Sequence, residues 1–298
     1  MQVQITRLEA AQALCSTSAK ASAFIRSQPL FSSAFLFAQP APDTASVLKF
    51  LVYTATDPFL DTMRADIALQ FPSLAYLELE LAELFARTKM AFPAFKTPQV
   101  FSIVSGFSTD LYLRDGMLLI GLEHFTTDSA RYESPNIPRY IRVRLRPNTI
   151  APNVAQLLSD AYVATDPNAE RGILDEMVRW GKVYYFMENV LPCTPDSLIA
   201  GYSPTVMADV EANQKAIYNY FVSNRLFFER EPITISKFTG ERPATPEIGD
   251  KCPGRIGRWL GWQIVRKYAK DKRLTLAQVM AETDARKIFD QAKWRPQD

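Results

Sequence analysis

The chain has 298 residues, of which 47% are hydrophobic and 22% are charged, and its formal net charge is +2. This length can bury a sizeable core, as one large domain or two modest ones, and the near-neutral charge gives no overall case for nucleic-acid binding. Three scattered cysteines (Cys15, Cys193 and Cys252) are too few for a disulfide framework or a zinc knuckle, and they leave a Cys193–Cys252 bridge open.

The N-terminal segment does not resemble a signal peptide, because Arg7 and Glu9 interrupt it before an apolar core could form. No window of about 18 uncharged apolar residues follows, so we expect no transmembrane segment.

The first half of the chain combines helices with a short strand-rich stretch. Residues 1–45 favour helix in patches. Residues 73–90 form an amphipathic helix with Ser73 as its cap and Leu74, Leu77, Leu81 and Leu84 as its apolar stripe. The pattern then predicts short strands over 100–104, 111–113 and 117–122, with Arg114-Asp115-Gly116 as a hairpin turn.

After Pro152 the helical period returns, over 154–163, 172–190 and 205–228. A Pro-rich connection leads to a further long helix, and two short helices capped by Thr275 and Asp284 close the chain. We therefore expect a mainly helical α+β fold with a small antiparallel sheet in the 98–122 region. We expect one domain over 1–298, loosely divided into a helical part (1–97), a strand-rich part (98–150) and a helical part (151–298).

His124 is the only histidine, and it follows a predicted strand. A site with two histidine ligands is therefore impossible, and a histidine-dependent hydrolase would have to be built on His124. At this strand end His124 could face a cleft. The simpler interpretation is a partly buried histidine that makes a local hydrogen bond.

Carboxylates gather at Asp57, Asp61 and Asp66, and again at Asp128 and Glu133, without the spacing of a calcium-binding EF-hand loop. We interpret them as solvated surface groups, while an oxygen-only metal site stays open. We expect no metal site and no cofactor.

Arg142, Arg144 and Arg146 alternate with Ile141, Val143 and Leu145. This alternation is typical of an edge strand guarded by charge, and a short helix after Pro138 is the alternative.

The block Pro253–Tyr268 is the most informative stretch. Gly254, Gly257 and Gly261 fall at i, i+3 and i+7, which on a helix makes one stripe for close backbone packing. Basic and aromatic side chains occupy the other faces. They are candidate residues for binding an anionic ligand, a lipid headgroup or an acidic partner: Arg255, Arg258, Trp259, Trp262, Arg266 and Lys267. The alternative is that solvated charges surround a buried Gly/Trp stripe.

This block resembles the C-terminal signature of the GldB-like gliding-motility lipoproteins, and the resemblance extends over most of the chain. The other segments that carry it are Ile103–Phe107, Ile120–Glu123, Pro138–Tyr140, Arg179–Lys182, Tyr184–Phe186, Leu191–Pro192, Gly201–Ser203, Leu274–Leu276, Thr283–Ala285 and Lys293–Pro296. The resemblance implies an envelope protein associated with gliding motility and type IX secretion, with envelope or motility proteins as partners. Peripheral membrane association stays open, and so does a cytoplasmic location, because this chain shows no signal peptide.

The GldB-like family is distantly similar to zincin peptidases, in which a His-Glu-x-x-His helix follows the strands and a Glu-Gly pair begins a later helix. Here the helix at Val154–Tyr162 contains neither a histidine nor a glutamate, and Trp180-Gly181 occupies the position of the Glu-Gly pair. The resemblance therefore implies a zincin-like architecture without its catalyst, a pseudoenzyme with no catalytic residues. The competing hypothesis is a hydrolase that uses His124 or a carboxylate-bound metal.

Overall fold

The computed structural model describes residues 1–38, 40, 42–134, 137–142, 144–166 and 171–296. The chain divides into two compact units: one comprises 1–86 and 94–151, and the other comprises 87–93 and 152–298. The larger segment of the second unit begins at residue 152. The expectation of one domain stays a prediction.

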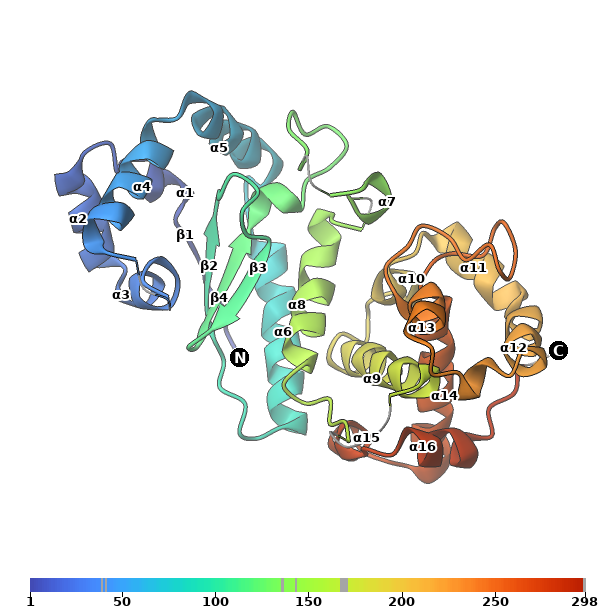
Figure 1. The fold of residues 1–298 in the computed structure, drawn as a ribbon. Helices are drawn as coiled ribbons and strands as arrows, with labels where there is room; N and C mark the ends of the chain where they lie inside the picture. The colour runs from blue at the N-terminus through green and yellow to red at the C-terminus, as the bar shows by residue number, and fades with distance from the viewer. Residues whose placement is uncertain (39, 41, 135–136, 143, 167–170, 297–298) are drawn as a thin grey trace. The chain divides into compact units, whose positions relative to one another are not determined.

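The first unit contains a four-stranded sheet with helices on both sides (Figure 1). Its strands are β1 (Ile5–Arg7), β2 (Gln99–Ile103), β3 (Leu111–Arg114) and β4 (Met117–Gly121), in the order β1-β2-β4-β3. On one side of the sheet lie α1 (Glu9–Ala13), α2 (Ser18–Ser27), α3 (Pro29–Phe31) and α4 (Thr44–Thr56), together with the π-helical turn Ser32–Leu36. On the other side lies α6 (Ala75–Ala91, to Ala86 in this unit). The unit also holds α5 (Pro58–Gln70), α7 (Arg139–Arg142) and two 3₁₀ turns, Leu122–His124 and Pro147–Thr149.

The sheet is mixed, so the expectation of an antiparallel sheet holds for one pair only. β3 and β4 pair antiparallel through the predicted hairpin, in which Asp115 and Gly116 adopt the positive φ values of 49° and 78° that such a tight turn needs. β2, in contrast, runs parallel to both β1 and β4. All of β4 and most of β2 are buried, as expected for parallel strands covered on both faces.

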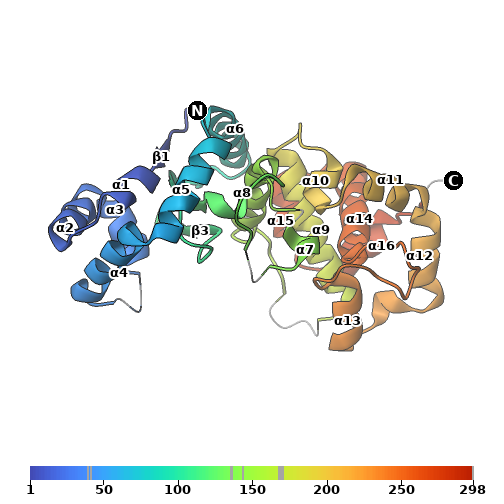
Figure 2. The ribbon, with the colours of Figure 1, turned by 90° about the horizontal axis from the view of Figure 1, so that it is seen from above.

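The second unit is helical. Its long members are α9 (Ile173–Val190) and α14 (Ile256–Lys272), which lie side by side with α16 (Ala285–Ala292) against them (Figure 2). The other helices are α8 (Ile150–Ser159, from Pro152 in this unit), α10 (Asp196–Ala200), α11 (Pro204–Ala212), α12 (Gln214–Ser223), α13 (Pro232–Thr239) and α15 (Leu276–Ala281), with a 3₁₀ turn at Leu226–Phe228.

Several helix predictions are confirmed. α6 buries Leu77, Leu81 and Leu84, and Ser73 Oγ accepts from the Ala75 amide at 3.2 Å. Asp284 caps α16 by accepting from the Lys287 amide at 2.9 Å, and Thr275 caps α15. The single helix expected over 205–228 is wrong, because α11 ends at Ala212 and α12 begins at Gln214.

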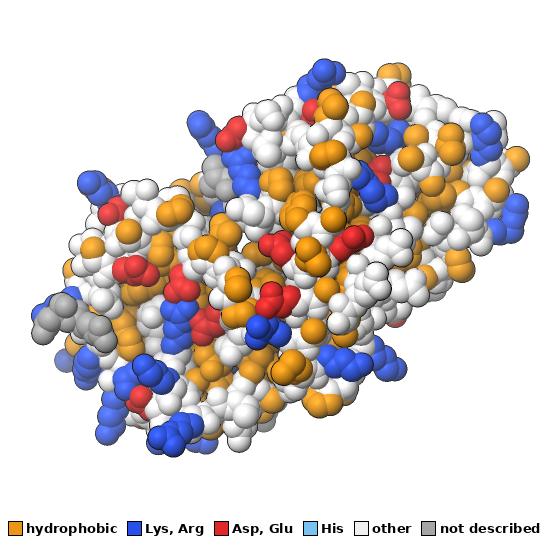
Figure 3. Space-filling model, turned by 180° about the vertical axis from the view of Figure 1, so that it is seen from behind, with side chains coloured by type: hydrophobic (Ala, Val, Ile, Leu, Met, Phe, Trp, Pro, Cys, Tyr) orange, Lys and Arg blue, Asp and Glu red, His pale blue; other side chains and the backbone are white. Residues whose placement is uncertain are grey.

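All three cysteines carry free thiols, so the Cys193–Cys252 bridge left open by the sequence is not formed in this structure. On the face drawn in Figure 3, Lys and Arg lie scattered among Asp and Glu, with hydrophobic side chains between them.

Candidate functional site

The glycines of the C-terminal block lie where backbones approach closely. Gly254 precedes α14 rather than lying on it, and a Cβ there would stand 1.8 Å from the Arg242 carbonyl oxygen. Within α14, a Cβ on Gly257 would stand 3.0 Å from Phe238 O, and one on Gly261 would stand 1.9 Å from Met177 O. The two glycines within α14 therefore serve different contacts, Gly257 with α13 and Gly261 with α9.

Arg255 lies just before α14 with a left-handed φ of 64°, and its side chain is buried. The guanidinium donates to Gly201 O at 3.1 Å and to the Tyr184 hydroxyl at 3.4 Å, and it pairs with Glu241 at 3.6 Å. Arg255 thus ties the start of α14 to the end of α10 and to α9.

Arg258 is also buried, and burial lowers the pKa of its guanidinium. Its Nε donates to Thr239 O at 2.5 Å, and its guanidinium carbon lies 3.7 Å from the centre of the Trp180 ring. Trp259 and Trp262 are 2% and 0% exposed, so both are core side chains.

Arg266 lies on the last turns of α14 between two acids. It donates from Nε to Glu188 at 2.5 Å and makes a bidentate pair with Asp196 at 2.7 and 2.9 Å. Burial raises the pKa of Glu188, and Arg266 opposes that shift. Lys267 is half-exposed and pairs with Asp271 one turn later.

The six candidate binding residues of this block therefore all have internal or neighbouring partners. Internal packing accounts for Arg255, Arg258, Trp259 and Trp262, which present little surface to a ligand. That the six residues bind a ligand or another protein stays a prediction.

Lys182 is a buried lysine on α9 that no sequence pattern indicated. Its ammonium donates to the carbonyls of Ala164 at 2.8 Å, Met280 at 3.4 Å and Glu282. Burial lowers its pKa to about 8. Only the tertiary structure reveals this site, because the three acceptors are backbone atoms far away in sequence.

The first unit holds an open cavity of about 460 Å³ at the carboxyl ends of β2 and β4. Ligand sites of open α/β sheets favour this edge of parallel strands. Mostly polar side chains line the cavity: Phe107, Glu123, His124, Thr126, Thr127, Asp128, Glu133, Ser134, Ile137, Arg139, Arg142, Leu145 and Arg146.

Glu123 holds one wall of this cavity in place. The side chain is 2% exposed, and one carboxylate oxygen accepts from the Ser105 amide at 2.6 Å, the Ser105 hydroxyl at 2.6 Å and the Phe107 amide at 3.2 Å. These bonds fix the turn after β2, where Gly106 and Phe107 have φ values of 70° and 65°. The second oxygen has no hydrogen-bond partner among the described residues.

His124 lines the cavity, as its strand-end position allowed. It is 9% exposed, and its ring packs edge-to-face on Phe107 with 5.4 Å between centroids. Both ring nitrogens are buried and find no partner in the described part of the chain. The expectation of a local hydrogen bond for His124 is therefore not met within those residues.

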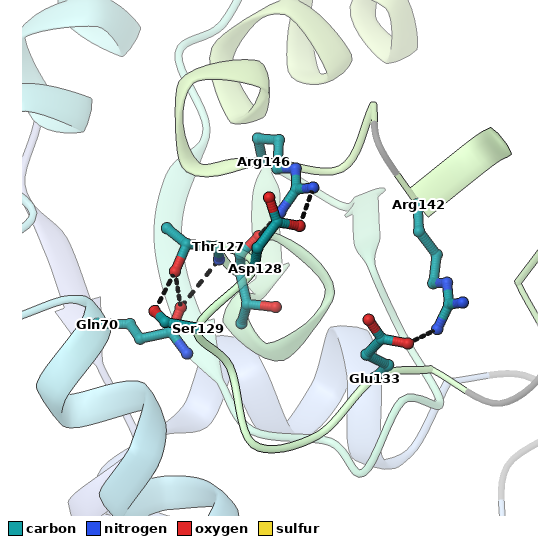
Figure 4. A network of polar contacts seen from close by, with 8 residues as sticks. Gln70, Thr127, Asp128, Ser129, Glu133, Arg142 and Arg146 are labelled. Atoms are coloured by element: carbon teal, nitrogen blue, oxygen red, sulfur yellow. Dashed lines mark hydrogen bonds and ion pairs between the residues drawn. The ribbon is translucent and has the colours of Figure 1, made fainter. Parts of the chain in front are cut away.

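The arginines of the cavity lie on or just after α7. The strand expected over 141–146 is wrong and the short helix is right, since Pro138 O accepts from the amides of Ile141 and Arg142; Val143 lies outside the described residues. Arg142 pairs with Glu133, and Arg146 pairs with Asp128 (Figure 4). For Arg139, no hydrogen bond or ion pair is found among the described residues.

The loop that carries these acids is fastened to α5. Gln70 accepts from the Thr127 amide at 3.0 Å, and Asp66 accepts from the Arg131 amide at 3.1 Å (Figure 4 shows the first contact). Asp57 caps α5 by accepting from the Phe59 amide at 2.8 Å. Within the described residues, no three His, Cys, Asp or Glu side chains gather as a metal site would require.

Comparison with known families identifies the chain. A family model described as gliding motility protein GldB matches residues 1–296, and the chain therefore belongs to this family. Membership makes it a gliding-motility protein and implies a lipoprotein of the cell envelope. In the part of the chain that the structure describes, no helix has the length and apolarity to span a bilayer. No curated protein and no solved structure matches the chain, and the suspected zincin-like architecture is not confirmed.

Proposed function

We propose that this member of the GldB family is a non-catalytic envelope component that acts by binding, within the gliding and type IX secretion machinery. Its binding site is the cavity at the carboxyl ends of β2 and β4, and its partner is a motility protein or a component of the envelope. Family membership supports a role in gliding motility at the cell envelope, and the cavity supports a role that consists of binding.

The observation that carries the proposal is that two arginines of the cavity form ion pairs with exposed acids. Arg142 and Arg146 are held in the wall with side chains 30% and 26% exposed, whereas their partners Glu133 and Asp128 are 66% and 91% exposed. Ion pairs with such exposed members stabilise a fold by only about 0.2–1 kcal/mol. These arginines can therefore exchange their partners for a ligand without loss of the fold.

Gene replacement in a gliding host tests this proposal. We expect the double variant Arg139→Gln/Arg142→Gln to accumulate as a folded protein and to fail in gliding. The control is Arg114→Gln, which removes an arginine with an exposed acidic neighbour elsewhere in the same unit. Normal gliding of the double variant at normal abundance would contradict the proposal.

A hydrolase is the second candidate, favoured by the presence of His124, Glu123 and Ser134 in one cavity. A histidine base works best when another group orients its ring, and His124 has no such partner among the described residues. The test is hydrolysis of chromogenic ester and peptide substrates by the purified protein. Activity that His124→Ala abolishes in a folded protein would favour the hydrolase.

A further inference from the structure

We infer that this cavity binds a small molecule, or the end of a polymer, that carries a phosphate or carboxylate group, with Arg139, Arg142 and Arg146 as its anion contacts. The inference rests on the proposed binding role of the cavity and adds the chemical class of the ligand.

The guanidinium groups are the first ground. Arginine keeps its charge at every physiological pH, and its planar fork matches the two oxygens of a carboxylate or phosphate. Arg139 lines the cavity with no partner among the described residues, and Arg142 and Arg146 have exposed ones. A bound anion can accept hydrogen bonds from Arg139 directly. It can also replace Glu133 as the partner of Arg142, or Asp128 as the partner of Arg146.

His124 is the second, independent ground. A buried polar group normally has a hydrogen-bond partner, and both nitrogens of this nine-tenths buried ring lack one among the described residues. The ring lines the cavity, so a ligand with hydroxyl or anionic oxygens can supply that partner once the ring turns one of its buried nitrogens toward it. The hydroxyls of Thr126, Thr127 and Ser134 belong to the same lining.

The lining also holds three carboxylates, and they make the inference testable. Glu123 uses one oxygen to accept three hydrogen bonds from the turn after β2. Glu133 competes directly with an incoming anion for Arg142. Removal of the Glu133 charge should therefore tighten binding of an anion, whereas it would weaken binding of a cation.

The size of the cavity fits a small polar molecule. Its volume of about 460 Å³ lies within the range of small-molecule sites, roughly 300–1,000 Å³. We therefore choose sugar-sized probes: glucose 6-phosphate for the phosphate, glucuronate for the carboxylate, and glucose as the neutral counterpart.

Isothermal titration calorimetry of the full chain at low ionic strength is the test, because salt screens the attraction between exposed charges. We expect wild type to bind glucose 6-phosphate or glucuronate and not glucose, and the preferred probe identifies the anionic group. Arg139→Gln/Arg142→Gln should weaken binding by about tenfold or more, the loss expected for charge-assisted hydrogen bonds. His124→Phe, which keeps the packing on Phe107, should also weaken it.

Glu133→Gln should tighten binding, and Arg114→Gln should leave it unchanged. Equal binding of glucose, binding of neither anion, or weaker binding by Glu133→Gln would overturn the inference. If no anion binds and the double variant still fails to glide, the inference fails and the proposed function stands. If an anion binds and that variant glides normally, the proposed function fails and the anion site stands.

Discussion

The contact between α9 and α14 predicts a large effect from a single added methyl group. In Gly261→Ala, the new Cβ would stand 1.9 Å from Met177 O and 2.4 Å from Met177 C. Both are backbone atoms, so no side chain can rotate away. The two helices would have to separate by about 1 Å, in an interior packed as densely as a crystal.

The magnitude follows from two opposing effects. Overpacking a core costs about 1–3 kcal/mol, and a backbone obstacle puts this case at the upper end. Alanine returns about 1 kcal/mol as the better helix former. We therefore expect the free energy of unfolding to fall by about 2 kcal/mol, which lowers Tm by about 4–8 °C.

Urea and thermal unfolding followed by circular dichroism measure this loss. Gly249→Ala is the matched control, because a Cβ there meets no heavy atom within 4 Å, and its stability should stay within about 0.5 kcal/mol of wild type. Gly257→Ala, with its nearest obstacle at 3.0 Å, should lie between the two. If Gly261→Ala is as stable as Gly249→Ala, the close approach of the helices is refuted.

Three further predictions concern the second unit. Burial lowers the folded-state pKa of Lys182 from 10.5 to about 8, so the unfolded chain binds more protons than the folded one between these two pH values. The free energy of unfolding of wild type, relative to that of Lys182→Met, should therefore rise by about 2–3 kcal/mol from pH 7 to pH 10. A difference between the two proteins that stays constant with pH in urea unfolding would contradict this. Cys193 is exposed, whereas Cys252 is half-buried and burial raises the pKa of its thiol to about 12. A thiol reagent should therefore label Cys193 fast and Cys252 much more slowly, as peptide mass spectrometry can check. Arg266→Met leaves Glu188 and Asp196 without their cation and should lower the free energy of unfolding in urea by about 2 kcal/mol. Lys267→Met breaks only an exposed ion pair and should lower it by less than about 0.5 kcal/mol. Equal losses would show that the Arg266 ion pairs stabilise the fold no more than an exposed pair does.

Local patterns predicted the elements whose cause is local. The leucine spacing of α6, the Asp115-Gly116 turn and the caps at Thr275 and Asp284 each act within a few residues of themselves. The pairing of strands, in contrast, joins residues that are distant in sequence. The parallel partners of β2 were not predicted because residues 5–7 lie far from residues 100–102. The Pro-rich connection predicted before the long C-terminal helix contains α13, and Pro232 occupies the first turn of that helix, where proline is favoured.

The same limit applied to the candidate sites. The acceptors of Arg255 and Arg258 are backbone carbonyls at Gly201 and Thr239, which no spacing within the C-terminal block could reveal. The cavity in the first unit was partly visible, since His124 follows a strand and the arginines of residues 142–146 stood out. Their convergence required the parallel register of β2 and β4 and the short helix at Arg139–Arg142.

The tryptophans have a spectroscopic consequence. All four of them, at positions 180, 259, 262 and 294, belong to the second unit. Intrinsic emission excited at the red edge of the indole band therefore reports on that unit alone, while far-ultraviolet dichroism reports on the helices of both. Coincident midpoints from these two signals would mark one cooperative transition, and separate midpoints would assign the emission change to the second unit and the remainder to the first.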